Sequence, residues 1–358
     1  MFDTSTIAHL VRPNILALRP YSSARDEYKA VATGQTSGPA IFLDANENSL
    51  GGPLDEDFSR YPDPGQWDLK SALAGQRQLD PEQIFLGNGS DEAIDLLIRA
   101  FCAPGRDEIV ILPPTYGMYA VQAAIQDALI CEVPLRSDFT PDMPAILAIA
   151  SERSKLLFLC SPNNPSGNRF PETDIREILE HFPGVVVVDE AYIDFAEGRS
   201  CTEWIAQYPN LVVLQTFSKA WGLAGLRIGM AFSNTFIISI LNKIKYPYNL
   251  NVQTTTLALQ ALQRREQVLE KVAILLQERS RLADALRQVP CVEHVFPSDA
   301  NFLLVKVRDA NLIYQYLCMQ NIVVRNRTNT LHCADCLRIT IGTPEENERL
   351  LEALRFFN

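Results

Sequence analysis

The sequence predicts an α/β protein with a large domain, in which helices flank a mainly parallel sheet, and a smaller α+β domain. Three observations favour this class. The chain has 358 residues, which is enough for two domains with sizeable cores. Short apolar runs alternate with longer helical stretches up to about residue 214, as in parallel α/β units. From about residue 255 the pattern changes to a long charged helix and then to strands separated by helices.

The predicted strands of the large domain are short runs of apolar residues. Runs without alternating polar residues suit strands that are covered on both faces, as they are in a parallel sheet. These runs are residues 84–86, 109–112, 156–159, 185–188 and 211–214.

The smaller domain is expected in the last third of the chain. A long charged helix is predicted from about residue 255 through Gln263-Arg264-Arg265-Glu266, followed by strands at 302–307, 322–324 and 337–341. The predicted domains are an amino-terminal arm at 1–29, a small domain made of 30–50 and 255–358, and a large domain at 51–254.

Composition excludes several classes of protein. The formal charge is −11, from 43 acidic and 32 basic side chains, which disfavours non-specific binding of nucleic acid. The amino terminus lacks the basic start and apolar core of a secretory signal, and no apolar run is long enough to cross a bilayer. Eight scattered cysteines are typical of free thiols in the cytosol. We therefore expect a soluble cytoplasmic protein with no nucleic-acid or membrane partner.

One short segment resembles part of a metal site. His332-Cys333-Ala334-Asp335-Cys336 contains a C-x-x-C spacing, but the chain has no second C-x-x-C that would complete a zinc site. No metal is predicted.

Polar and unusual residues follow each predicted strand of the large domain. Ligands of open parallel sheets bind outside the carboxyl ends of the strands, so these turns are expected to meet at one site. The turns are G-N-G-S at 87–90, P-P-T-Y at 113–116, S-P-N-N-P-S-G at 161–167, D-E-A-Y at 189–192 and S-K at 218–219.

Lys219 is the most informative residue of this set. A lysine at the end of a buried strand is costly to leave charged and unpaired, which indicates a functional role. It could form a Schiff base with an aldehyde, while Ser218 and Arg227 hold an anion nearby; pyridoxal phosphate has both an aldehyde and a phosphate. The alternative is a surface lysine beside a glycine-rich helix entry.

Asp189 directly follows four valines, and a buried carboxylate there needs a cationic partner. A protonated pyridine nitrogen is such a partner, and the pairing would keep the ring able to accept electrons. The alternative is a helix N-cap. Tyr192, a few residues on, could donate a hydrogen bond to the ring oxygen.

The remaining turns have a functional and an ordinary interpretation. Ser90 is expected to cap a helix whose first N–H groups could bind a phosphate, provided that Asp91 and Glu92 point away. A capped helix without a ligand fits this motif equally well. Tyr116 could stack on a planar cofactor or belong to the core. Asn164 lies in a turn under any interpretation and could also donate to the cofactor.

With these residues in place, the chain resembles the fold-type I pyridoxal-phosphate aminotransferases and, among them, the histidinol-phosphate aminotransferases. The resemblance extends from about Arg19 to Phe357. It rests on R-P-Y-S-S-A-R at 19–25, L-D-A-N-E-N at 43–48, Y-P-D-P at 61–64, C-S-P-N-N-P-S-G at 160–167, V-V-D-E-A-Y at 187–192, T-F-S-K-A-W-G-L-A-G-L-R-I-G at 216–229, V-V-R-N-R at 323–327 and L-R-I-T-I-G-T at 337–343. Two departures are Ser49, where the family often has proline, and Ser166, where it has threonine.

The resemblance implies a role for each matching residue. Lys219 would bind the cofactor aldehyde and carry the proton, and Asp189 would pair with the ring nitrogen. The other implied cofactor contacts are Tyr192 and Asn164 on the ring oxygen, Tyr116 on the ring face, and Ser90, Asp91, Ser218 and Arg227 on the phosphate. Tyr61 would reach the phosphate from the neighbouring subunit of a homodimer. Arg338 would bind the anionic end of the substrate, and the pocket would be completed by Arg325, Tyr21, Asn46 and Tyr248, with Arg25 as a weaker candidate.

The implied reaction is transamination between L-histidinol phosphate and 2-oxoglutarate in histidine biosynthesis. Two alternative functions are compatible with the same fold: an aromatic amino-acid aminotransferase and a threonine-phosphate decarboxylase. A third, non-catalytic reading is a ligand-sensing regulator, which Lys219 and Asp189 disfavour.

Overall fold

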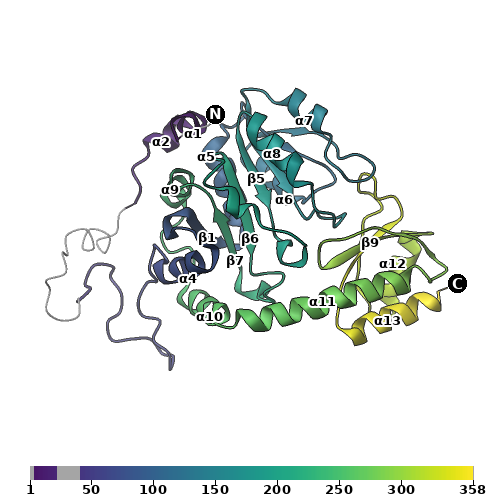
Figure 1. Cartoon of the computed structure of the whole chain (residues 1–358). Coiled ribbons are helices and arrows are strands. Elements are labelled where there is room, and N and C mark those ends of the chain that lie inside the picture. The colour runs from purple at the N-terminus through teal and green to yellow at the C-terminus, as the bar shows by residue number, and fades with distance from the viewer. Residues whose placement is uncertain (1–3, 22–40, 358) are drawn as a thin grey trace.

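The computed structural model describes residues 4–21 and 41–357, and it contains two sheets joined by a long helix (Figure 1). The larger sheet has seven strands in the order β1-β7-β6-β5-β4-β2-β3. The strands are β1 (Ile84–Asn88), β2 (Glu108–Ile111), β3 (Leu129–Glu132), β4 (Ser154–Cys160), β5 (Val185–Asp189), β6 (Leu211–Thr216) and β7 (Ile228–Phe232). Only β7 runs antiparallel to its neighbours, so the five strands predicted from sequence end at the same edge.

Side chains of the large sheet alternate between two hydrophobic cores, one on each face. Val185 and Val187 lie in one core with α5, while Val186 and Val188 lie in the other with α8. This explains why the strand is apolar at every position. The helices around the sheet are α1 (Thr4–Leu10), α2 (Pro13–Ala17), α4 (Trp67–Arg77), α5 (Gly89–Phe101), α6 (Met118–Ile125), α7 (Met143–Ile149), α8 (Glu172–His181), α9 (Thr235–Ile244) and α10 (Val252–Leu262).

Short 3-10 turns complete the large part of the fold. They are η1 (Pro81–Gln83), η2 (Ile193–Phe195), η3 (Cys201–Trp204) and η4 (Ala224–Leu226). The last of them leads directly into β7 and ends at Arg227, which adopts a left-handed backbone conformation with φ of 54°. After that turn the chain reverses direction, and β7 runs antiparallel to β6.

The smaller sheet is antiparallel and has the order β10-β11-β9-β8. Its strands are β8 (Val292–Val295), β9 (Phe302–Val307), β10 (Arg325–Asn326) and β11 (Cys336–Thr340). The helices α11 (Arg265–Leu286), α12 (Ala310–Met319) and α13 (Pro344–Arg355) contribute apolar side chains to its separate core. The two sheets agree with a division into large and small parts, while the domain boundaries stay a prediction.

A small hydrophobic cluster joins the two parts. It contains Tyr192 and Phe195 from the large part, Val272 from α11, and Ala300 and Phe302 from the small part. Figure 1 shows α11 running from α10 to the small sheet beneath both parts. We call this cluster the seam.

Several sequence-based expectations were wrong in detail. The predicted strand at 322–324 is not one: Ile322 and Val324 pack against the core of the small part, and strand pairing begins only where Arg325 faces Arg338. The helix expected from residue 255 is interrupted at Gln263-Arg264 and forms two helices. β3, β7 and β8 were not predicted, because β3 and β8 are mostly exposed and lack a continuous apolar run, and β7 contains a glycine.

The helix after β1 begins two residues earlier than expected. Gly89 is already helical, so the N-cap is Asn88 rather than Ser90, and no side chain caps the helix. The Gly89 N–H donates to the Arg227 carbonyl at 2.8 Å, and Ser90 and Asp91 of the first turn line a pocket at the ends of the strands.

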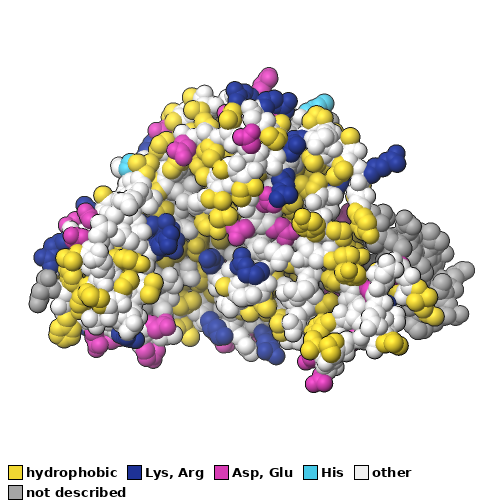
Figure 2. All heavy atoms as spheres, turned by 180° about the vertical axis from the view of Figure 1, so that it is seen from behind, with side chains coloured by type: hydrophobic (Ala, Val, Ile, Leu, Met, Phe, Trp, Pro, Cys, Tyr) yellow, Lys and Arg dark blue, Asp and Glu magenta, His cyan; other side chains and the backbone are white. Residues whose placement is uncertain are grey.

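On the face shown in Figure 2, basic, acidic and hydrophobic side chains are interspersed, and neither the basic nor the acidic side chains form a continuous patch. None of the helices in the described ranges is both long and apolar enough to span a bilayer.

Candidate active site

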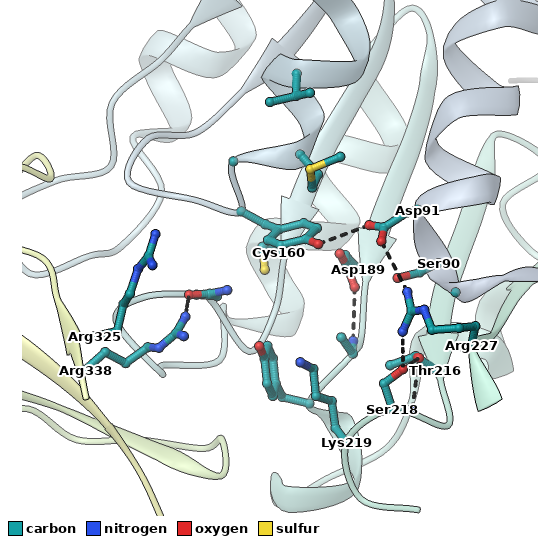
Figure 3. A pocket seen from close by; sticks show the side chains of 18 of the residues that line it. Ser90, Asp91, Cys160, Asp189, Thr216, Ser218, Lys219, Arg227, Arg325 and Arg338 are labelled. Carbon is teal, nitrogen blue, oxygen red and sulfur yellow. Dashed lines mark hydrogen bonds and ion pairs between the residues drawn. The ribbon is translucent and has the colours of Figure 1, made fainter. Parts of the chain in front are cut away.

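A pocket of about 600 Å³ lies at the carboxyl ends of the parallel strands, between the large and small parts. Most of the residues predicted from sequence line it: Ser90, Asp91, Tyr116, Asn164, Asp189, Tyr192, Ser218, Lys219, Arg227, Arg325 and Arg338. Figure 3 shows Ser90, Ser218 and Arg227 on one side, Arg325 and Arg338 on the other, and Asp189 and Lys219 between them.

Asp189 ends β5 and is buried, with 2% of its surface exposed. Tyr119 donates a hydrogen bond from its hydroxyl to Asp189 Oδ2 at 2.6 Å, and the Ala191 N–H donates to Oδ1 at 3.1 Å. Burial raises the pKa of Asp189 to about 6, against the lowering effect of these two donors. No basic group forms an ion pair with this carboxylate within the described part of the chain.

Lys219 lies just after β6, on the turn that follows Thr216. Its Nζ is 5.5 Å from the centre of the Tyr192 ring. Burial, together with the nearby guanidinium of Arg338, lowers the pKa of Lys219 below its ordinary value. A larger fraction of this amine is therefore unprotonated at neutral pH than of an exposed lysine.

The start of α5, the Ser218 turn and Arg227 form a cradle for an anion. The carbonyl of Arg227 accepts a hydrogen bond from the Gly89 N–H at 2.8 Å, and its guanidinium donates to Ser218 Oγ at 3.4 Å. Gly229 allows β7 to approach this closely, since a Cβ there would lie 2.1 Å from Ser90 N. An uncapped helix start with a guanidinium beside it favours negative charge.

The acidic residues at the start of α5 are held by neighbouring groups. Glu92 turns back and accepts hydrogen bonds from the Asn88 N–H at 2.5 Å and from Asn249 Nδ2 at 3.0 Å. Asp91 accepts from the Tyr116 hydroxyl at 3.0 Å and lies 3.6 Å from Arg227 Nη2. Glu92 thus points away from the cradle, as a phosphate site requires, whereas Asp91 stays at its edge.

The opposite side of the pocket is basic. Arg325 and Arg338 are directly paired across β10 and β11. Arg338 donates to Asn164 Oδ1 at 2.5 Å, which fixes the amide of Asn164 at the pocket wall. This contact ties the small sheet to the turn after β4.

Four of the predicted residues do not line this pocket: Tyr21, Asn46, Tyr61 and Tyr248. Tyr61 and Tyr248 stack on each other with ring centres 4.5 Å apart. Asn46 and Tyr61 line a second hollow formed by residues 45–62 and 251–253. Tyr21 lies on a third, and Arg25 is outside the described residues.

The sequence interpretation missed four polar or thiol side chains of the pocket environment. Thr216 donates to Ser218 Oγ at 3.0 Å, and Cys160 and Arg327 line the pocket. Tyr119 lies behind it, against Asp189. Two signals were available: Tyr119 follows Tyr116 by one helical turn, and Arg327 follows Arg325 by two residues, the repeat of one strand face.

His332, Cys333 and Cys336 do not lie with further potential metal ligands from the described ranges 4–21 and 41–357. Burial raises the pKa of Cys333 to about 12 and that of Cys336 to about 11. Among the residues that the structure describes, no group of three His, Cys, Asp or Glu side chains is placed to hold a metal ion.

Comparison with known proteins agrees with this geometry. The family model for aminotransferase class I and II matches residues 46–354. Histidinol-phosphate aminotransferase of Cytophaga hutchinsonii is 50% identical over 348 residues, covering 97% of this chain and 98% of that protein. The enzyme of the same name from Parabacteroides distasonis is 51% identical over 346 residues, covering 97% of each.

Solved structures show the same fold. Histidinol-phosphate aminotransferase from Sinorhizobium meliloti, in complex with pyridoxal-5'-phosphate, matches with a TM-score of 0.78 and 24% identity over 96% of each chain. The sequence similarity to the curated relatives is far higher, and on that similarity the chain belongs to the class I and II aminotransferases and, within them, to the histidinol-phosphate aminotransferases.

Proposed function

We propose that this protein transfers an amino group from L-histidinol phosphate to 2-oxoglutarate with pyridoxal phosphate as cofactor, in the cytoplasmic synthesis of histidine. The observation that carries the proposal is one pocket with three features: a buried carboxylate that forms no ion pair with any described residue, a partly buried amine, and an anion cradle beside them. The class of the curated relatives supports the same activity.

The residues present fit pyridoxal phosphate. A buried carboxylate is stable only beside a positive charge or a proton, and a pyridinium nitrogen would give Asp189 that partner. The uncapped start of α5 with Ser218 and Arg227 would hold the phosphate. When bound, the cofactor supplies an aldehyde for amine exchange and a ring that accepts electrons from the substrate's α-carbon.

The protein's own groups would then divide the work. Lys219 would hold the cofactor through its aldehyde, and its amine, once free, would take the α-proton of the substrate; the lowered pKa of Lys219 favours this role as a base. Asp189 would keep the ring nitrogen protonated, and the hydrogen bond from Tyr119 orients its carboxylate. Tyr116, Tyr192 and Asn164 line the same pocket, where Tyr116 would cover the ring and the other two would bind its oxygen.

The basic side of the pocket suits two different substrates. Histidinol phosphate has a phosphate and no carboxylate, whereas glutamate has two carboxylates. A guanidinium can make paired hydrogen bonds with either group, so Arg338 and Arg325 can bind both anions in turn.

A homodimer would complete the site. The segment 41–61 exposes apolar side chains, with Ile41 86% and Leu50 98% exposed, which is unusual for groups that remain in water. Figure 1 shows this segment extending away from the large sheet. A second copy that covers it would bring Tyr61 to the neighbouring phosphate cradle, with Asn46, Tyr21 and Tyr248 along the same surface.

The activity is tested by a screen of amino donors with purified enzyme and 2-oxoglutarate. Histidinol phosphate should be the best donor, with ping-pong kinetics, and Lys219→Ala should remove both turnover and the visible absorbance of the lysine-bound cofactor. Faster turnover of phenylalanine would favour an aromatic aminotransferase. Release of carbon dioxide from threonine phosphate would favour the decarboxylase.

The shared site is tested by mixed dimers of Lys219→Ala and Tyr61→Ala chains, each nearly inactive alone. If Tyr61 serves the neighbouring subunit, the hybrid has one site with both residues intact and activity returns to about half of the wild-type value per dimer. An inactive hybrid would show that Tyr61 serves its own chain or none.

A further inference from the structure

The basic side of the pocket contains a third guanidinium, that of Arg327, in addition to those of Arg325 and Arg338. Arg327 lines the same pocket as Arg325 and Arg338. Arg325 and Arg327 are two residues apart, so they share one face of the chain at β10, and the Arg327 N–H extends the pairing by donating to the Cys336 carbonyl at 2.8 Å.

This arrangement costs stability in the absence of an anion. Arg325 lies directly opposite Arg338 in the sheet, and like charges at opposed positions repel. Burial and the two neighbouring guanidiniums lower the pKa of Arg327, and burial is also the main cause that lowers the pKa of Arg338. In addition, Nε of Arg327 is buried and makes no hydrogen bond within the described structure.

No acidic side chain offsets the three positive charges. In residues 4–21 and 41–357, none of the ion pairs involves Arg325, Arg327 or Arg338. Of the two pocket carboxylates, Asp91 lies on the opposite side of the pocket and Asp189 lies between the two sides (Figure 3). Arg338 is held by the neutral Asn164. A cluster of this kind is matched by a ligand with more than one negative charge.

We propose that Arg327 is the residue that makes this pocket selective for a phosphate dianion over a carboxylate. A phosphomonoester carries a charge of about −1.5 to −2 at neutral pH and three acceptor oxygens, whereas a carboxylate carries one charge and two oxygens. Arg325 and Arg338 can satisfy a carboxylate, and Arg327 supplies the additional charge and donor for the phosphate. The inference rests on the proposed function, and it identifies the part of the amino donor that the enzyme selects.

Binding without turnover tests this directly. The pyridoxamine-phosphate form of the holoenzyme cannot exchange its amine with an amino donor, so calorimetry on that form gives the affinity alone. Two ligands are compared: histidinol phosphate, and histidinol, which lacks only the phosphate. Arg327→Gln should weaken binding of histidinol phosphate about 10- to 100-fold, as expected for one lost hydrogen bond to a charged group, and should change histidinol by less than about threefold.

Two further variants separate recognition from a structural role. Arg327→Lys keeps the charge and should recover part of the affinity, and Arg308→Gln, at an exposed position of the same part of the fold, should leave both ligands unaffected. The pH profile gives a second readout. Wild-type affinity for histidinol phosphate should rise from about pH 5 to about pH 7, as the phosphate loses its second proton, and Arg327→Gln should flatten this rise.

Each result decides the question. Equal weakening of both ligands by Arg327→Gln, or no weakening of either, would overturn the assignment. A wild-type enzyme that binds histidinol and its phosphate equally would also overturn it. The proposed function has a separate readout, since wild-type turnover of histidinol phosphate is measured with 2-oxoglutarate and does not depend on this comparison.

Discussion

The buried carboxylate of Asp189 should destabilise the enzyme whenever the cofactor is absent. Its pKa is raised from an ordinary 3.8 to about 6 because the folded protein removes it from water. A group whose pKa is higher in the folded than in the unfolded state favours folding at low pH, and that contribution is lost as the pH rises through the folded value. The difference of about two pH units corresponds to about 3 kcal/mol of unfolding free energy at neutral pH.

Asp189→Asn removes this pH-dependent cost. Asparagine has nearly the same shape, and its amide can still accept from the Ala191 N–H and donate to the Tyr119 oxygen. In urea denaturation of the apoenzyme we expect the variant to gain about 3 kcal/mol over the wild type at about pH 8, and the gain to shrink toward about pH 4. The holoenzyme of the same variant should lose transamination, because the ring nitrogen has no anionic partner.

Asp138→Asn is a control with the opposite sign. Hydrogen bonds from Thr140 hold the pKa of Asp138 below its usual range, so removing its charge should slightly lower stability at neutral pH. A difference between wild type and Asp189→Asn that stays constant over this pH range would refute the reasoning. An apoenzyme made less stable by Asp189→Asn at about pH 8 would refute it as well.

Four other substitutions have clear expected effects. Tyr119→Phe removes the 2.6 Å hydrogen bond to Asp189 and should weaken cofactor binding about tenfold or more in a spectroscopic titration, with the fold unchanged in circular dichroism. Gly229→Ala places a Cβ 2.1 Å from backbone atoms of α5 and should cost about 3 kcal/mol or more in denaturation, whereas Gly75→Ala, in open space on α4, should stabilise by about 1 kcal/mol. Burial lowers the pKa of Lys70 from 10.5 to about 8, so Lys70→Met should raise stability by up to about 3 kcal/mol near pH 7, and the gain should shrink above about pH 8, because the wild type becomes more stable there as Lys70 loses its proton.

Much of the pocket was predictable because it lies at the ends of strands with an unmistakable pattern. The four valines before Asp189 and the apolar run before Lys219 fix both the strands and the edge at which those side chains emerge. The positions of these residues required no knowledge of long-range contacts. Their roles with the cofactor remain proposals.

Other features depended on contacts between distant segments and were missed for that reason. β7 is recognisable only through its pairing with β1 and β6, and Tyr119 only through its hydrogen bond to a residue 70 positions later. Arg327 was passed over because R-N-R does not show that a strand begins at Arg325.

The seam affects which lengths of substrate the enzyme accepts. It consists of Tyr192, Phe195, Val272, Ala300 and Phe302. The amine of Lys219 follows a strand of the large sheet, whereas Arg325 and Arg338 belong to the small sheet. The seam packs these two parts together and so keeps the distance between the amine and the two guanidiniums constant. An amino donor that is one methylene longer or shorter would therefore require repacking of the seam, for example at Val272 and Ala300, which do not line the pocket. A larger side chain at position 300 or a smaller one at position 272 should change the distance between the two parts. The enzyme would then accept amino donors of a different length, while the reacting groups stay the same.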